Sequence, residues 1–208
     1  MKRTNVGIGI GVTVLLTMVL PLAAMASSQT AASLTATCTK LADRAFMEPL
    51  DWSSYHLVLG TSGDDVLTGT ARADLICGFG GDDKILGKGG NDVIIGGLGN
   101  DILSGGAGAD LLLGGRGRDQ LWGQVGWDDL RDGPGPGALH GGRGDDHLLV
   151  RCGSSAKLFG DRGADRIDAN NGQPNVISGG PGQDRAFADF SIDRASGVEG
   201  LERFGSGC

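Results

Sequence analysis

An aliphatic residue returns every nine residues along most of this chain. Between residues 60 and 149, ten consecutive nine-residue units keep one register, best seen in GGLGNDILS (96–104) and GGAGADLLL (105–113). Glycine stands at positions 1 and 4 of the unit, aspartate at position 6, and leucine or isoleucine at position 8. So strict a period is typical of a solenoid, in which each repeat builds the same unit and stacks on its neighbours.

Positions 7 to 9 of each unit predict a short strand. Side chains alternate faces along a strand, so position 8 points inward when positions 7 and 9 point outward. Thirteen of the fourteen position-8 residues are Leu or Ile, which predicts one continuous core ladder. The ladder consists of Leu67, Ile76, Ile85, Ile94, Leu103, Leu112, Leu121, Leu130, Leu139, Leu148, Leu158, Ile167, Ile177 and Ala186. Positions 1 to 6 must then reverse the chain, and glycine at positions 1 and 4 permits the positive φ angles of a tight reversal.

The register after residue 149 changes by insertion and does not decay. Clear units restart at Gly160 and Gly179, 19 residues apart, which equals two nonapeptides and one extra residue. We therefore expect the solenoid to span residues 57–187.

Short caps are expected at both ends of the solenoid. Residues 27–56 predict an N-terminal cap with a short amphipathic helix, because apolar residues from Leu34 to Ala45 follow helical spacing. Residues 188–208 predict a C-terminal cap, which a repeat stack needs to protect its end coil.

The first 26 residues predict a secretory signal peptide. Lys2 and Arg3 form a basic start, residues 6–22 are apolar, and Ala24-Met25-Ala26 is a small-x-small cleavage signal. We expect cleavage after Ala26 and a secreted chain with no membrane insertion afterwards; an uncleaved membrane anchor is the alternative.

The balance of charge points to a cation. The chain carries a net charge of −7 at pH 7, with 40 glycines and only 5% aromatic residues. Such an acidic chain does not suit nucleic acid, and its mutually repelling carboxylates favour disorder unless a cation offsets them.

The turns offer the ligands that calcium prefers. A tight reversal leaves backbone carbonyls beside the position-6 carboxylate, and a flexible set of six to eight such oxygens suits Ca²⁺. Mg²⁺ retains its waters and demands a stricter octahedron, and transition metals favour nitrogen or sulfur ligands, which these turns lack.

These nonapeptides resemble the RTX, or haemolysin-type, calcium-binding repeat. The resemblance covers roughly residues 57–187. It implies an all-β fold, a right-handed parallel β-roll solenoid with two nonapeptides per coil. It also implies Ca²⁺ ions held between neighbouring turns of one flank, and a chain that is largely unfolded without them. It does not imply a biological role.

The motif places the candidate metal ligands on two flanks of the roll. On the first flank the position-6 aspartates are Asp65, Asp83, Asp101 and Asp119. On the second flank they are Asp74, Asp92, Asp110, Asp128, Asp146, Asp165 and Asp184. The position-1 glycines that would accompany them are Gly78, Gly87, Gly96, Gly105, Gly114, Gly123, Gly141 and Gly160.

Departures from the motif lower the expected number of ions. Neighbouring pairs number three on the first flank and six on the second, so at most nine sites are possible. Arg72 replaces a position-4 glycine and weakens the site between Asp74 and Asp92. Gly137 stands where an aspartate belongs, and Ala156 and Asn175 fill that slot in the following coils. We therefore expect the first flank to lose calcium after Asp119, leaving about seven ions.

Four cysteines in an exported chain favour disulfides over free thiols. Cys77 and Cys152 lie about four coils apart, roughly 19 Å at strand spacing, too far for a bond. Cys38–Cys77 and Cys152–Cys208 are the favoured pairs. In the first, the N-terminal helix would cover an outward apolar face formed by positions 7 and 9 between Leu75 and Leu113. The alternative is an uncovered face used for dimerisation.

The sequence predicts a calcium-binding protein that is not an enzyme. His56, His140 and His147 are scattered, with no nucleophile and base at a telling spacing. Cell-surface polysaccharide or protein is a candidate partner. A calcium-dependent adhesion or polysaccharide-binding module is therefore the alternative, acting through the acidic flank or through Trp122 and Trp127, for which ordinary packing is the simpler explanation.

Overall fold

The computed structural model describes residues 38–40, 52–151, 154–189 and 192–202. The predicted signal peptide and the Cys152–Cys208 pair lie outside these ranges. Residues 38–40 are helical, and the rest of the predicted N-terminal helix is also outside the described part. Within it, no helix has the length and apolar character needed to cross a membrane.

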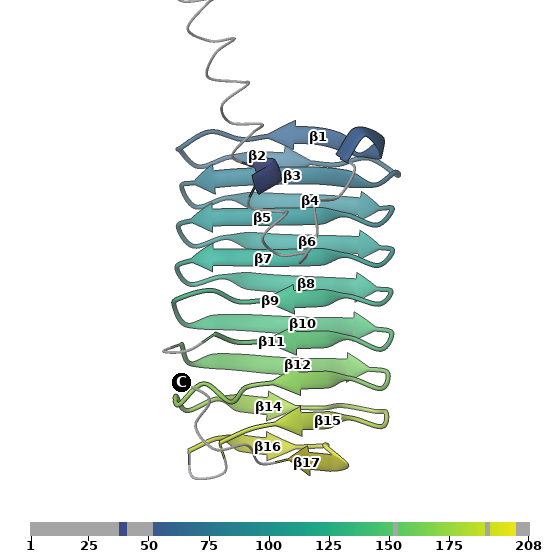
Figure 1. Cartoon of the computed structure of the whole chain (residues 1–208), viewed down its shortest axis with the longest axis vertical. Helices are drawn as coiled ribbons and strands as arrows, with labels where there is room; N and C mark the ends of the chain where they lie inside the picture. The colour runs from purple at the N-terminus through teal and green to yellow at the C-terminus, as the bar shows by residue number, and fades with distance from the viewer. Residues whose placement is uncertain (1–37, 41–51, 152–153, 190–191, 203–208) are drawn as a thin grey trace, which may run out of the picture.

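Two parallel sheets face each other and form a flattened solenoid (Figure 1). The chain alternates between them, so that all neighbours within a sheet are parallel strands from successive coils. In the part described, one sheet has nine strands: β1 (His56–Leu59), β3 (Asp74–Gly80), β5 (Val93–Leu98), β7 (Leu111–Arg116), β9 (Asp129–Arg131), β11 (His147–Leu149), β13 (Arg166–Asp168), β15 (Arg185–Phe187) and β17 (Gly200–Glu202). The other has eight: β2 (Val66–Thr68), β4 (Lys84–Gly89), β6 (Ile102–Ala107), β8 (Gln120–Val125), β10 (Gly137–Arg143), β12 (Ala156–Arg162), β14 (Val176–Ser178) and β16 (Arg194–Ser196). The predicted all-β parallel β-roll is confirmed.

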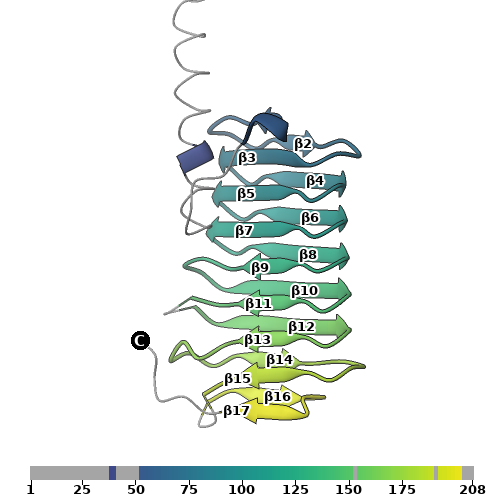
Figure 2. The same ribbon diagram turned by 45° about the vertical axis from the view of Figure 1, so that its right-hand side comes forward.

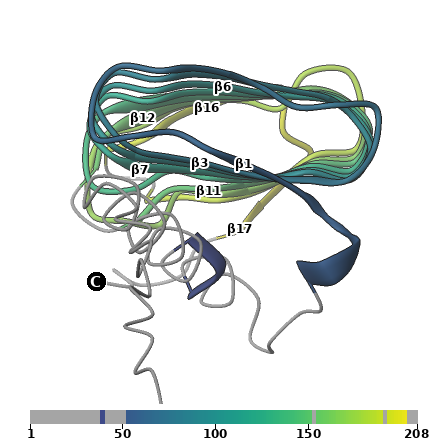
Figure 3. The same cartoon turned by 90° about the horizontal axis from the view of Figure 1, so that it is seen from above.

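The repeat length sets the register between coils. Ile94 pairs with Leu112, one coil of two nonapeptides later, and the coils superimpose as one flat loop when viewed from above (Figure 3). In the pairs from β10–β12 to β13–β15 the partner lies one residue further on, as in the pairing of Leu148 with Ile167. The inserted residues therefore lengthen turns and leave the inward ladder intact.

The core is the position-8 ladder between the two sheets. From Ile76 to Ala186 its members are at most 1% exposed, and only Leu67, in the first coil, is partly buried. Each coil contributes just two such side chains, so the core is thin, and the turns at both flanks must supply part of the stability.

A second apolar cluster covers part of the outer side of the nine-stranded sheet. Leu75, Val93 and Leu111 are at most 5% exposed although they point outward, and Trp52 of the 3-10 helix η1 (Trp52–Ser54) packs against this cluster. Cys38 is bonded to Cys77 in the cluster, and Figure 2 shows residues 38–40 beside the sheet. The predicted Cys38–Cys77 disulfide is confirmed, with the apolar face covered from within the chain.

The segment predicted as a C-terminal cap adds one strand to each sheet. Ala195 of β16 pairs with Ile177, and Leu201 of β17 pairs with Ala186. The side chains of both strands are mostly exposed. The segment thus covers the end of the roll by continuing it with polar strands, an arrangement that protects a solenoid's last edge.

Candidate metal sites

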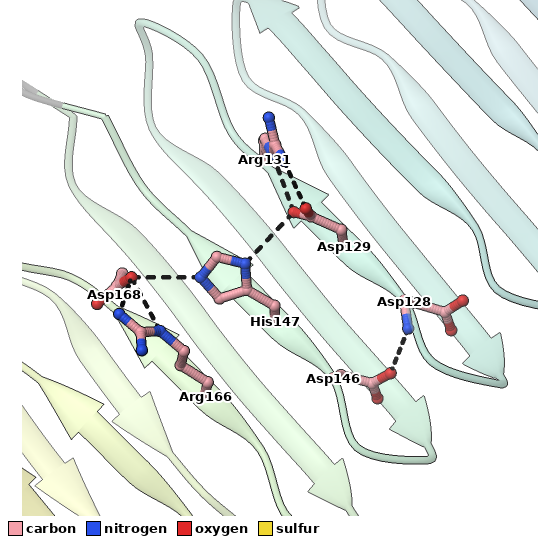
Figure 4. Close-up of polar contacts among 7 residues, drawn as sticks. All are labelled: Asp128, Asp129, Arg131, Asp146, His147, Arg166 and Asp168. Atoms are coloured by element: carbon pink, nitrogen blue, oxygen red, sulfur yellow. Dashed lines mark hydrogen bonds and ion pairs between the residues drawn. The ribbon is translucent and has the colours of Figure 1, made fainter. Parts of the chain in front are cut away.

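From Asp83 onward, each position-6 aspartate is fixed by the coil that precedes it. Its Oδ1 accepts a hydrogen bond from the backbone N–H of the position-6 residue one coil earlier, at 2.8–3.0 Å along both flanks. Figure 4 shows one such bond, from Asp128 N–H to Asp146 Oδ1, at 2.8 Å. The last aspartate of the second flank, Asp184, donates its N–H to Glu199 Oε2 at 2.7 Å, so that Glu199 ends the chain of bonds.

The second carboxylate oxygen, Oδ2, is buried and has no hydrogen-bond partner in nine of these aspartates. Those nine side chains belong to residues at most 2% exposed. They are Asp83, Asp92, Asp101, Asp110, Asp119, Asp128, Asp146, Asp165 and Asp184. A buried carboxylate oxygen without a donor is strongly unfavourable unless a cation compensates it. The row of orphaned oxygens is therefore the feature that calls for metal.

Position 1 is glycine in the clear units with an aspartate at position 6 because the Oδ2 atom of that aspartate occupies the space beside it. A Cβ added at Gly69 would lie 2.6 Å from Asp74 Oδ2 and 2.6 Å from the carbonyl oxygen of Gly87, one coil later. The same carboxylate and carbonyl pair surrounds Gly60, Gly78 and most later position-1 glycines. A carboxylate and a backbone carbonyl thus converge at most of these glycines, which fits the oxygen ligands of Ca²⁺.

This geometry corrects one expectation about glycine. Positive φ angles occur at position 4, as predicted, for example 122° at Gly99, but position 1 does not have them. Position 2 has them instead, including the non-glycine residues Phe79 and Lys88. The prediction for position 1 was wrong because the need there is for space beside the carboxylate and not for a left-handed backbone.

The first two aspartates differ from the other nine. Thr61 donates its N–H and its hydroxyl to Asp65 Oδ2, at 2.6 and 2.9 Å. Thr70 does the same for Asp74 Oδ2, at 2.6 and 3.1 Å, and His56 Nδ1 lies 2.7 Å from Asp74 Oδ1. Sequence reasoning missed this capping, although threonine at position 2 of the first two units was its signal.

Neutral side chains, Ala156 and Asn175, take the position-6 slot of the first flank in the two coils after Gly137. Asn175 Oδ1 accepts the N–H of Ala156, as an aspartate would. Its Nδ2 donates to the carbonyl oxygens of Ala169 and Gln173, at 3.1 and 2.9 Å. An amide therefore satisfies this turn where other turns present an orphaned carboxylate oxygen.

Burial raises the pKa of the orphaned carboxyls. Desolvation is the largest cause in every case, and the neighbouring position-6 carboxylates add repulsion in most of them. The pKa rises to about 7 for Asp92, Asp101, Asp110 and Asp146, and to about 6 for Asp128 and Asp165. It is also raised for Asp83, Asp119 and Asp184.

These shifts predict that acid stabilises the metal-free roll. A carboxyl whose pKa is raised on folding from the ordinary 3.8 binds its proton more tightly in the folded state, so its stabilising effect is lost as pH rises through about 7. Metal-free protein should therefore keep more of its β-sheet circular dichroism signal at pH 5 than at pH 8. With saturating calcium the melting temperature should instead be higher at pH 8, because protons compete with the ion. An equally weak β-sheet signal at both pH values in the metal-free state would contradict the shifts.

A separate charged network lies on the outer side of the nine-stranded sheet (Figure 4). The His147 ring stands between Asp129 and Asp168, at 3.6 and 3.2 Å, and these two carboxylates also pair with Arg131 and Arg166. The contacts that the His147 ring nitrogens make to Asp129 and Asp168 raise the pKa of His147 to about 9. The network ties three coils together where the apolar outer cluster has ended.

Side chains alone do not form a metal centre here. Nowhere in the described ranges do three His, Cys, Asp or Glu side chains gather in a group that could hold an ion. A cation between two coils would therefore be bound by one or two carboxylates, with backbone carbonyls as the remaining protein ligands. Such an oxygen set is compatible with Ca²⁺, whose geometry is flexible.

Comparison with known proteins agrees with this geometry. The RTX calcium-binding nonapeptide repeat family, whose model spans four copies of the repeat, matches residues 59–94, 77–112, 86–121, 105–133 and 157–186. No curated protein matches the chain. The matched segments together span residues 59–133 and 157–186, which is half of the chain and includes aspartates of both flanks, so the chain belongs to the RTX calcium-binding nonapeptide repeat family.

Proposed function

We propose that this is a secreted, non-enzymatic calcium-binding protein whose roll folds as Ca²⁺ binds between successive coils. The observation that carries the proposal is the row of buried Oδ2 atoms without hydrogen-bond partners. Each of them stands next to a glycine at which a carbonyl oxygen of the next coil converges in most repeats. When bound, the ion supplies the positive charge that offsets these carboxylates, while the chain's own turns position the oxygens.

The number of sites follows from the orphaned oxygens. Among position-6 aspartates, neighbouring pairs in which both Oδ2 atoms lack a partner number two on the first flank and five on the second, giving seven. The Thr61 and Thr70 caps remove Asp65 and Asp74 from the count. Extracellular modules bind Ca²⁺ with dissociation constants of about 10⁻⁴ to 10⁻³ M, so such a chain would order on reaching calcium outside the cell.

The predicted signal peptide over residues 1–26 supports export. The division into an N-terminal cap (27–56), a roll (57–187) and a C-terminal cap (188–208) is part of the same proposal. In it, the Cys38–Cys77 bond fastens the N-terminal cap to the roll.

Counting bound calcium in a variant tests the proposal. Asp110 belongs to two neighbouring pairs, with Asp92 and with Asp128. Asp110→Asn keeps the Oδ1 acceptor but replaces the orphaned oxygen with an amide, so equilibrium dialysis should find at least one ion fewer per chain. Asp145→Asn is the matched control, because Asp145 is exposed and its Oδ1 only accepts the Ala164 N–H. A wild-type chain that binds no calcium, or an Asp110→Asn chain that binds as much as wild type, would contradict the proposal.

A calcium-dependent polysaccharide-binding function is the second candidate. Trp122, His140 and Phe159 stack along the outward face of β8, β10 and β12, with ring centroids 6.0 and 4.4 Å apart. Depressions of about 400 and 430 Å³ lie toward the two ends of these strands. The stacked rings form an apolar ridge on this outer face, against which a sugar ring can pack.

Retention on immobilised polysaccharides tests this second function. Trp122→Ala should reduce calcium-dependent retention at least several-fold, while Trp127→Ala, which alters a turn residue that is 70% exposed, should not. Equal retention of both variants and wild type would remove the aromatic stack from consideration.

A further inference from the structure

The unit at residues 132–140 exchanges the two residues on which the site depends. Position 1, which is glycine in the other clear units, is Asp132, and position 6, which is aspartate in those units, is Gly137. By its repeat positions alone, this unit lacks the position-6 aspartate that would bind metal, which is why the sequence predicts that the first flank loses calcium after Asp119. The geometry of the turn gives a different answer.

The carboxylate of Asp132 occupies the place that a position-6 side chain normally takes. In the preceding coil, a Cβ added at Gly114 would lie 2.6 Å from Asp119 Oδ2. In the exchanged unit, a Cβ added at Gly137 would meet Asp132 Oδ2 first, with Asp132 Cγ at 2.7 Å and Oδ1 at 2.9 Å. The carboxylate thus lies between positions 1 and 6 of its unit, as in the regular units, but it belongs to the residue at position 1 instead of the residue at position 6.

Asp132 Oδ2 shares the defining property of the nine orphaned oxygens. The residue is 2% exposed, and this atom has no hydrogen-bond partner. Oδ1 accepts the N–H of Gly133 at 2.9 Å, which is a local bond in place of the usual bond to the previous coil. The carboxylate is therefore held in place by one oxygen, and the other remains available.

The turn stacks directly on the Asp119 turn. The N–H of Ala138 bonds to the carbonyl oxygen of Asp119 at 2.9 Å, and the N–H of Gly117 bonds to that of Pro134 at 3.2 Å. Asp119 Oδ2 is itself buried without a partner. Two orphaned carboxylate oxygens therefore belong to adjacent turns of the same flank, as in the regular sites.

The next turns on this flank show what a turn without metal looks like. Ser154, 1% exposed, donates its hydroxyl to the carbonyl oxygen of Gly133 at 2.8 Å and accepts the N–H of Gly135 at 3.0 Å. Asn175 satisfies its own turn through its amide. Neutral donors replace the carboxylate there, whereas Asp132 Oδ2 has received no donor.

We infer that Asp132 and Asp119 form an additional calcium site, so that the first flank carries calcium one coil further than its position-6 aspartates extend. This inference rests on the proposed function of the regular sites. It raises the expected count from seven ions to eight, and it assigns a ligand to an aspartate outside the repeat's usual position.

Calcium counting in variants of the exchanged unit tests the inference. Asp132→Asn keeps the Oδ1 acceptor for Gly133 and removes the orphaned oxygen, so equilibrium dialysis against calcium should find one ion fewer per chain than in wild type. The double variant Asp132→Gly, Gly137→Asp restores the regular unit and should bind as many ions as wild type. Asp161→Asn is the matched control, because the Asp161 side chain is 44% exposed and should leave the count unchanged.

The possible failures are distinguishable. If wild type binds no calcium, the proposed function fails together with this site. If wild type binds calcium and Asp132→Asn, folded by circular dichroism, binds the same number, this site alone is overturned. Should Asp132→Asn not fold, Asp132→Gly serves as the second variant, since it installs the glycine that other units carry at position 1. A folded Asp132→Gly chain with an unchanged count would equally overturn the site.

Discussion

Removing calcium at pH 7.5 should abolish most of the β-sheet circular dichroism signal of this protein, and millimolar calcium should restore it. Ten Oδ2 atoms, those of the nine position-6 aspartates and of Asp132, are buried without a partner. Carboxylates desolvated in this way cost free energy in the absence of a cation. The inner core that opposes this cost is thin, because its ladder has only two side chains per coil. Binding free energy is then folding free energy, as in other small metal-dependent domains.

Two controls make the calcium experiment specific. Magnesium at the same concentration should restore much less of the signal, because it demands a strict octahedron and retains its waters. The experiment should be repeated with reductant, since the Cys38–Cys77 bond links the N-terminal segment to β3 and can hold that part of the chain together. A spectrum that is the same in chelator and in calcium, with and without reductant, would contradict calcium-coupled folding.

Leu112→Ala should destabilise the calcium-loaded roll by about 2–5 kcal/mol, the usual cost of truncating a buried leucine. Leu112 is fully buried, and its neighbours in the sheet are Ile94 and Leu130. The truncation leaves a cavity between the two sheets. Because each coil of a solenoid contacts chiefly its neighbours, no other part of the chain can move in to fill that cavity. The shift in the urea midpoint at saturating calcium, multiplied by the denaturant slope, measures the loss.

Ile102→Ala is the matched control for the core. Ile102 points outward from β6 and is 37% exposed. Its truncation should change stability by within about 0.5 kcal/mol, as is usual for surface substitutions. Equal destabilisation by both variants would contradict the assignment of position 8 as the core.

The period of the sequence was enough to predict most of the fold. Because strand side chains alternate, position 8 had to be the inward position, and Leu112 and its equivalents are buried as expected. The 19-residue spacing of Gly160 and Gly179 was correctly read as an insertion that leaves the ladder in register. The apolar outward residues around Cys77 pointed to a covering segment, and the Cys38–Cys77 bond supplies the link.

The features that sequence reasoning missed depend on hydrogen bonds and shape. The sequence shows an aspartate at position 6 in both of the first two units of the first flank. In the structure, however, Thr61 donates a hydrogen bond to Asp65 Oδ2, whereas the equivalent oxygen of Asp83 has no hydrogen-bond partner. Position 1 was expected to need a left-handed backbone, whereas it needs space for the neighbouring carboxylate. Judged by repeat position alone, the exchange of Asp132 and Gly137 removes the ligand from this unit. In the structure, the turn still contains a carboxylate at the usual place.

The most direct measurement is a crystal structure of the calcium-loaded protein with an anomalous difference map that locates the ions. The account predicts peaks between successive turns on both flanks, each beside the Oδ2 atoms that have no hydrogen-bond partner, and no peak beside Asp65 Oδ2 or Asn175. Peaks confined to exposed surface carboxylates, with the buried Oδ2 atoms distant from any ion, would contradict it.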